Sequence, residues 1–226
     1  MREVDENLRR DRMQDFGKKY GALLIAALVL LLGAIGGWLY WQNRQQEQAA
    51  AQSEELMSIY TDIGAGKTEQ AVKRLQPLET SDNEVVRALA LLTGAAVAVD
   101  SNDRAAALSN YRALAGDGDL PESYQNLGLI RATALEFDTI KPEEVVARLE
   151  PLTKPGNPWF GSAGELTAMA YLKQGQSDRA GRLFAAMAAD PQVPETIRSR
   201  SVQIAGTLGV DASAALPQTA QPGSAE

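Results

Sequence analysis

The chain divides into one long apolar stretch and a series of shorter amphipathic segments. Residues 20–41 carry no charged side chain. At 1.5 Å per residue they would form a helix of roughly 33 Å, which matches a hydrocarbon core of about 30 Å. Aromatic residues stand at both ends, as expected at membrane–water interfaces: Tyr20 at one end, and Trp38, Tyr40 and Trp41 at the other. The pattern predicts a transmembrane helix over residues 20–41.

The basic residues around this stretch predict its orientation, because Lys and Arg gather on the cytoplasmic side of membrane helices. Six of them precede the stretch, whereas the same distance after it holds only Arg44. We therefore expect residues 1–19 to be a cytoplasmic tail and the C-terminal part to lie outside the cytoplasm. The alternative is a signal peptide cleaved near Ala51. It is less favoured, because the apolar core of a signal peptide has only about 7–15 residues.

Two glycines inside the apolar stretch, Gly33 and Gly37, lie four residues apart. Such a pair permits close approach of another membrane helix, and one interpretation is a helix contact at these two glycines. Glycine is also common in membrane helices that make no such contact, so this alternative stays open.

Beyond Trp41 the sequence predicts helices only. No Gly or Pro occurs between Trp41 and Gly64, so the membrane helix can continue outward as one rod. The following segments have ten to eighteen residues between Gly, Pro, Asp or Asn, and none shows the alternation of a strand. Residues 211–226 are rich in Ala, Pro, Gln, Ser and Gly and are expected to be disordered.

Two short motifs recur along the helical part at a nearly constant distance. The sequence RLQPL at residues 74–78 returns as RLEPL at 148–152, and the Ala-x3-aromatic motif at 107–111 returns at 180–184. Half of this distance is about 37 residues, close to the 34-residue tetratricopeptide repeat, which is a pair of helices. The fold class predicted for residues 42–210 is therefore an all-α, tetratricopeptide-like α-solenoid.

The clearest unit runs from residue 171 to 191. Within it, Gly175 is expected to turn the chain between two helices, Ala180 to let these helices approach, and Phe184 to fill the space beside them. Weaker copies precede this unit, so we expect about four helix pairs. A last helix over residues 195–208 has no partner and is expected to cap the open end of the stack.

The most apolar stretch of the helical part is residues 85–99, in which Arg87 is the only charge. It is too short to be a second membrane span. We expect a helix that is buried on most faces in the middle of the stack.

The composition excludes several kinds of chemistry. The chain of 226 residues has no His and no Cys, and its formal charge is −7. Nucleophilic triads, thiol chemistry and zinc sites of imidazole or thiolate are therefore impossible, and we expect no catalytic residue, no metal site and no cofactor. The negative charge disfavours nucleic acid as a partner. The Gly-Asp-Gly-Asp sequence at 116–119 lacks the further carboxylates of a calcium loop, and we expect a turn there.

What remains is a surface for protein binding. In helical repeats the first helix of each pair lines a concave face that binds peptides. By repeat position, eight residues are expected on this face: Leu127, Ile130, Ala134 and Phe137 in the third pair, and Glu165, Met169, Leu172 and Lys173 in the fourth. The larger apolar members can equally be packed core, and both alternatives stay open.

The layout resembles the YfgM-like family of ancillary subunits of the bacterial SecYEG translocon. The residues that carry the resemblance are Lys19-Tyr20-Gly21-x-Leu23 at the entry of the apolar stretch and Gly37-Trp38-x-Tyr40-Trp41 at its exit. The order of tail, span, rod, degenerate repeats and final helix also matches, whereas the Ala- and Pro-rich tail departs from the family.

The resemblance implies a single-pass protein of the bacterial inner membrane, with a cytoplasmic N-terminus and a periplasmic domain. It implies association with the SecYEG translocon and with a membrane-anchored periplasmic chaperone. The implied role is to help newly secreted, still unfolded proteins leave the channel and fold.

Two other functions are compatible with the residues. The first is a non-catalytic scaffold of another cell-envelope complex, in division or cell-wall synthesis. The second is an enzyme, which is disfavoured because only carboxylate or Lys chemistry is left and no motif arranges such groups.

Overall fold

The computed structural model describes the backbone of residues 2–212 and the side chains of residues 28–212. This part of the chain contains nine α-helices, one short 3-10 helix and no strand, so the all-α prediction is confirmed. The elements are α1 (Arg2–Gly64), α2 (Thr68–Leu75), α3 (Glu84–Asp100), α4 (Arg104–Gly116), α5 (Glu122–Glu136), α6 (Pro142–Leu149), η1 (Glu150–Leu152), α7 (Phe160–Lys173), α8 (Ser177–Ala189) and α9 (Glu195–Thr207). The predicted disordered tail, residues 211–226, lies outside the described residues from position 213 onward.

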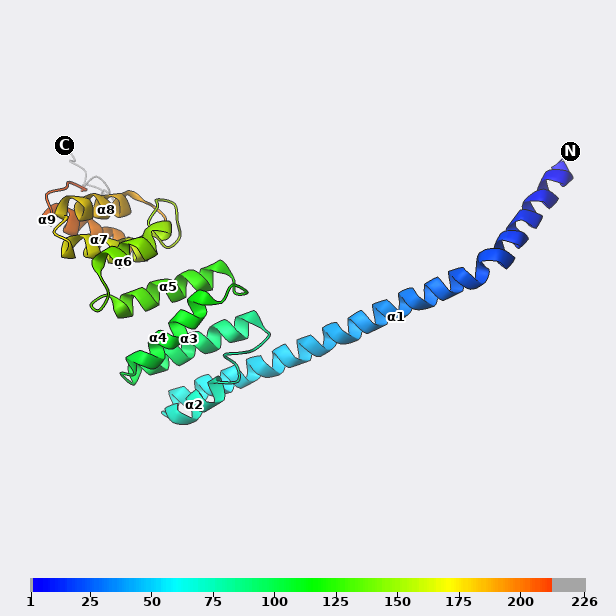
Figure 1. The fold of residues 1–226 in the computed structure, drawn as a ribbon, viewed down its shortest axis with the longest axis horizontal. Helices are drawn as coiled ribbons and strands as arrows, with labels where there is room; N and C mark the ends of the chain where they lie inside the picture. Colours follow the sequence, from blue (N-terminus) through cyan, green and yellow to red (C-terminus); the bar gives the residue numbers. More distant parts are fainter. Residues whose placement is uncertain (1, 213–226) are drawn as a thin grey trace, which may run out of the picture. The chain divides into compact units, whose positions relative to one another are not determined.

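Helix α1 runs without a break from Arg2 to Gly64, as the lack of Gly and Pro after Trp41 predicts (Figure 1). The side chains of residues 28–41 are exposed. A search of the described residues finds no helix with an apolar stretch of membrane-spanning length. The first part of the predicted membrane helix, residues 20–27, lies outside the described side chains.

The chain forms two compact units, residues 1–57 and residues 58–226. The second unit holds the helical repeats, which begin with the last turns of α1. Successive helices pack against one another in chain order: α3 on α4, α4 on α5, α6 on α7, α7 on α8 and α8 on α9. We call the end of α1, α3, α5 and α7 the first helices of the four pairs, and α2, α4, α6 and α8 the second helices.

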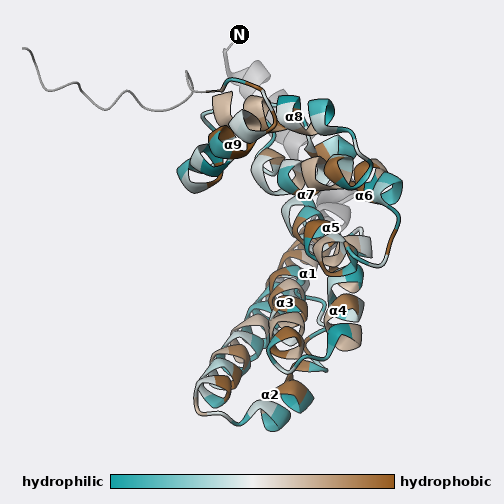
Figure 2. Cartoon of the chain, turned by 90° about the vertical axis from the view of Figure 1, so that its left-hand side faces the viewer, coloured by the Kyte–Doolittle hydropathy of each residue, from teal (hydrophilic) through white to brown (hydrophobic). Residues whose placement is uncertain are grey.

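The repeat register is the same in all four pairs. Two residues, four positions apart on each second helix, are almost completely buried: Ala71 and Leu75, Ala107 and Tyr111, Val145 and Leu149, and Ala180 and Phe184. A small side chain followed by a larger one lets the paired helices approach and then fills the space beside the crossing. Figure 2 shows the resulting alternation of hydrophobic and hydrophilic residues along these helices.

Left-handed residues turn the chain inside three of the pairs. Gly66 and Gly175 have φ angles of 78° and 71°, and Asn102 occupies the corresponding turn with φ of 57°. Glycine adopts this region without strain, and Asn is among the few other residues that tolerate it. The prediction for Gly175 is confirmed, whereas the role of Asn102 was not predicted.

Helix α3 is buried on most of its faces and open along one strip. Eight of its residues are buried, including Ala88, Leu91 and Ala95, as expected for a helix in the middle of the stack. Val85 and Val99, however, are 50% and 45% exposed. The prediction of burial on most faces is therefore confirmed, because α3 contacts both α4 and α2, and only the strip that holds Val85 and Val99 is open.

Helix α9 packs on α8 at the end of the stack. Its contact with α7 is close, because a Cβ added at Gly161 would lie 3.2 Å from Ile197 of α9 and 3.1 Å from Val193 in the loop before it. The exposed residues of α9 are mostly polar: Glu195, Thr196, Arg200, Gln203, Gly206 and Thr207. A polar outer face is what a terminal helix needs to end a repeat stack in water.

Candidate functional site

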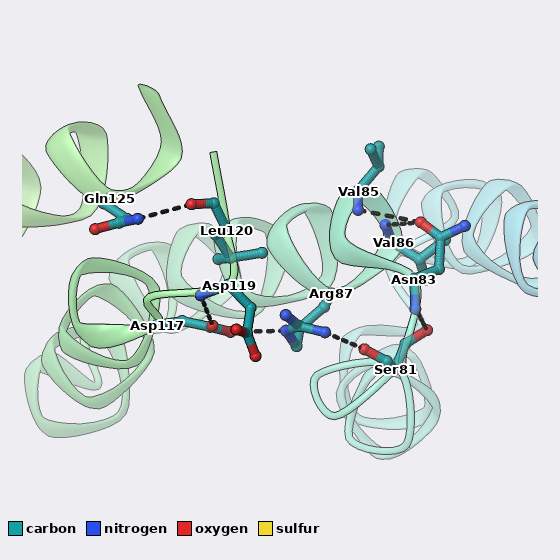
Figure 3. Close-up of polar contacts among 9 residues, drawn as sticks. All are labelled: Ser81, Asn83, Val85, Val86, Arg87, Asp117, Asp119, Leu120 and Gln125. Carbon is teal, nitrogen blue, oxygen red and sulfur yellow. Dashed lines mark hydrogen bonds and ion pairs between the residues drawn. The ribbon is translucent and has the colours of Figure 1, made fainter. Parts of the chain in front are cut away.

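Arg87 on α3 forms hydrogen bonds with two of the loops that connect consecutive helix pairs (Figure 3). Its Nε donates a hydrogen bond to Asp117 Oδ2 at 2.7 Å, and the same guanidinium donates to the carbonyl oxygen of Ser81. Asn83 caps α3 by accepting from the backbone N–H groups of Val85 and Val86, both at 3.1 Å. Arg87 therefore ties the loop before α3 to the loop before α5.

The Gly-Asp-Gly-Asp sequence forms the turn between α4 and α5, as predicted. Asp117 binds Arg87 and accepts from the backbone N–H of Asp119 at 3.0 Å. The hydrogen bond from Arg87 holds the pKa of Asp117 below its usual value, although burial acts in the opposite direction. No cluster of three carboxylates that could hold a metal ion occurs within the described part of the chain.

A buried carboxylate connects the second and third pairs. Glu136 on α5 is only 6% exposed, and it accepts a hydrogen bond from Arg148 of α6 at 2.7 Å and another from Arg112 of α4. Burial raises the pKa of Glu136, but the hydrogen bonds and charges of the two guanidinium groups outweigh burial and leave the pKa below its usual value. This ion cluster fixes α5 relative to α4 and α6.

The four predicted binding residues of α5 differ in exposure. Ile130 and Phe137 are 6% and 9% exposed and belong to a hydrophobic cluster with residues of α6 and α7. Leu127 is half-buried, and Ala134 is exposed. Ile130 and Phe137 are therefore mainly core residues. Leu127 and Ala134 are the members of this group with solvent-accessible surface for a partner.

The four predicted residues of α7 lie on its open side or at its border. Met169 is 47% exposed, and Leu172 is half-buried. Glu165 accepts two hydrogen bonds from Arg200 of α9, at 2.6 and 2.8 Å. Lys173 lies 2.7 Å from Asp138 Oδ1 and 4.3 Å from the centre of the Phe137 ring.

These contacts bring two of the predicted residues together, Phe137 and Lys173, and connect neighbouring helices across the open side. Lys173 connects α7 to the end of α5, and Glu165 connects α7 to α9. At the start of the stack the hydroxyl groups of Tyr60 and Thr93 lie 3.3 Å apart and connect α1 to α3. We call the exposed sides of the first helices, from Tyr60 to Met169, the docking face.

The part of the docking face on α3 and the exposed Arg131 on α5 were not predicted from the sequence. A signal for α3 was present, because Val85, Leu89, Leu92, Ala96 and Val99 follow one another at spacings of three or four residues. We interpreted this spacing as part of a helix that is buried on most faces, and so did not assign it to the binding face. No sequence signal separated Arg131 from the other surface charges.

The two glycines predicted to contact another membrane helix are in the described part of α1. A Cβ added at Gly33 or Gly37 would have nothing within 4 Å, so both positions are open to a neighbouring helix. The helix contact itself stays a prediction.

Comparison with known proteins agrees with the fold and with the resemblance predicted from the sequence. The family model described as "Tetratricopeptide repeat-like domain" matches residues 14–204. A Haemophilus influenzae protein named "Ancillary SecYEG translocon subunit" is 26% identical over 135 residues, which cover 59% of this chain and 65% of that protein. An Escherichia coli protein of the same name is 25% identical over 177 residues, which cover 78% of this chain and 84% of that protein.

The match with the Haemophilus protein thus spans slightly less than two thirds of that relative's length. No solved structure matches the chain. The two relatives confirm the resemblance to the YfgM-like ancillary subunits. Because the family model covers most of the chain and the helices follow its repeat pattern, the chain belongs to the tetratricopeptide repeat-like domain family.

Proposed function

We propose that this protein is a membrane-anchored, non-catalytic docking module of the Sec translocon that assists the transfer of secreted proteins to chaperones. The observation that carries the proposal is the open docking face on a tetratricopeptide-like stack, in a chain whose relatives are named as ancillary SecYEG translocon subunits. The absence of His and Cys from the sequence supports a role in binding rather than in catalysis.

In this proposal residues 20–41 anchor the protein in the inner membrane, with residues 1–19 in the cytoplasm and the repeats in the periplasm. The uncharged sequence supports an anchor, as do the aromatic residues at its ends and the excess of Lys and Arg before it. Gly33 and Gly37 offer an open surface to a translocon helix.

The docking face takes segments of secreted proteins or of a periplasmic chaperone. Among the residues predicted from the sequence, Ala134 and Met169 are its exposed members, and Leu127 and Leu172 border them. Glu165 already has a partner in α9, and Lys173 has one just after the end of α5, so they hold the face together and contribute polar edges rather than free charges.

Cysteine crosslinking in cells tests this function, because the chain has no Cys of its own. Ala134→Cys and Met169→Cys place a thiol on the docking face, and Ala113→Cys places one on the exposed side of a second helix as a control. We expect the first two variants to crosslink to translocon subunits, secreted proteins or a periplasmic chaperone, and the control to give none of these.

Equal products from all three positions, or none in cells with an intact translocon, would contradict the proposal. Crosslinks to division or cell-wall proteins, with the protein concentrated at the septum, would instead identify a scaffold of another envelope complex.

A further inference from the structure

The open side of α3 is apolar along most of the helix. Val85 and Val99 are half exposed near the two ends, Ala96 is exposed, and Leu89 and Leu92 are half-buried between them. With 17 residues, α3 presents this stripe over roughly 25 Å. An unpartnered stripe of this kind favours contact with an apolar side of another protein.

Arg131 on the neighbouring helix α5 is a cation without a carboxylate partner in the part of the chain that the structure describes. Five basic side chains occur on α3, α5, α7 and α9, and four of them bind an acidic group: Arg87 to Asp117, Lys173 to Asp138, Arg198 to Glu195 and Arg200 to Glu165. Arg131 is exposed and has no such partner among the described residues. Its neighbours one turn away on the same side of α5 are Leu127 and Ala134, which carry no charge.

The α3 stripe and the helix turn that follows Arg131 border a common cluster. Leu92 of α3 and Leu135 of α5 both pack against the buried residues Ala95, Tyr111 and Ala132. The open sides of the two helices are therefore next to each other on the docking face, and one segment of a partner can contact both.

We propose that α3 and α5 bind an amphipathic segment of a partner protein that places apolar side chains on the α3 stripe and a carboxylate on Arg131. The inference rests on the proposed docking function and names the chemistry of its partner. Arginine pairs with a carboxylate through two parallel hydrogen bonds, which are strong and directional. A segment without an acid would remove Arg131 from water without a partner, and a basic segment would be repelled, so Arg131 sets the specificity.

Two synthetic amphipathic helices of about 17 residues, the length of α3, test the inference. They share one apolar side and differ only in carrying Glu or Lys beside it, and both carry a photoreactive group. The full-length chain is held in nanodiscs of neutral lipid, and binding is measured as crosslinking to the chain, so that lipid-bound peptide does not contribute.

We expect the Glu peptide to crosslink to α3 and α5 with roughly tenfold higher affinity than the Lys peptide, the effect of about one charge-assisted hydrogen bond. Arg131→Glu should reverse the preference. Arg182→Glu is the matched control. Arg182 is also exposed and has no acidic partner among the described residues, but it lies on α8. This variant should leave the preference for the Glu peptide unchanged. Ala96→Gln should weaken both peptides by interrupting the stripe without adding a charge.

The alternatives give different results. Equal binding of both peptides on α3 and α5, unchanged by Arg131→Glu, would overturn the role of Arg131 and leave the docking function intact. Crosslinks only on second helices, or none, would contradict the docking function itself. If the chain without peptide sediments as a dimer that Arg131→Glu dissociates, the occupant is a second copy of this chain and the inference of another partner is wrong.

Discussion

At the scale of single residues, the repeat domain depends on small side chains where helices cross and on one buried charge between pairs. Ala180 has no exposed surface and lies in the cluster that also holds Phe160, Phe184 and Met187. Glu136 is held between two guanidinium groups from different helices. Both residues lead to measurable predictions.

Replacement of Ala180 by Trp should destabilise the fourth pair. The larger side chain has no space between α7 and α8, and overpacking of this kind costs about 1–3 kcal/mol, occasionally more. We expect a lower midpoint of thermal unfolding for the full-length chain. The control is Ala189→Trp, at an exposed position near the end of the same helix, which should change the midpoint little. An unchanged midpoint for Ala180→Trp would show that the repeat register is wrong.

Replacement of Glu136 by Gln should destabilise the domain at neutral pH by about 1–3 kcal/mol, because two guanidinium groups lose their charged partner. The pKa of Glu136 is lower in the folded state than in the unfolded state. Its contribution is therefore complete above the unfolded pKa of about 4.3 and is lost as the pH falls through the folded pKa.

The stability difference between the wild-type chain and Glu136→Gln should thus shrink below about pH 4, as measured by urea unfolding across pH. Glu144→Gln removes an exposed partner of the same Arg148 and should cost only about 0.3–0.5 kcal/mol. A penalty for Glu136→Gln that stays constant from pH 7 to about pH 3 would contradict the ion cluster.

At the scale of helices, α4 and α5 cross closely at Gly128. A Cβ added at Gly128 would lie 2.7 Å from the carbonyl oxygen of Tyr111 and 2.8 Å from the backbone N of Ala115. Both contacts are with backbone atoms, which cannot move aside as a flexible side chain can. Gly128 therefore sets the distance between the second pair and the third.

Replacement of Gly128 by Ala should force α4 and α5 apart and destabilise the domain, although Ala is the better helix former. Gly206→Ala on α9 is the control, since a Cβ there meets nothing within 4 Å. It should be neutral or stabilise the chain by up to about 1 kcal/mol. Thermal unfolding of both variants checks this, and a gain in stability for Gly128→Ala would exclude the close crossing.

At the scale of the whole molecule, the proposed anchor and orientation can be tested without the docking face. A thiol introduced by Asn7→Cys should be protected from a membrane-impermeant maleimide in spheroplasts, whereas Ala113→Cys should be labelled, because the excess of Lys and Arg keeps the N-terminal tail in the cytoplasm. Labelling of both positions, or release of the protein from membranes by carbonate, would contradict the single membrane span.

The sequence by itself determined that the chain is helical, where the repeats lie and which chemistry is impossible. Apolar spacing and the recurring Ala-x3-aromatic motif identified the buried pairs, such as Ala107 with Tyr111, because these positions follow from helix geometry alone. The missing His and Cys are likewise a property of composition.

Only the tertiary structure decided which apolar residues remain exposed and which charges remain unpaired. Helical spacing places Ile130 and Ala134 on one side of α5, yet the packing of α6 and α7 buries the first and leaves the second open. Lys173 and Arg131 are both basic residues on first helices, but within residues 28–212 only Lys173 has a carboxylate, Asp138, within reach. The sequence of a helix with several neighbours does not show which of its sides those neighbours leave uncovered. For this reason the docking face could be identified only from the tertiary structure.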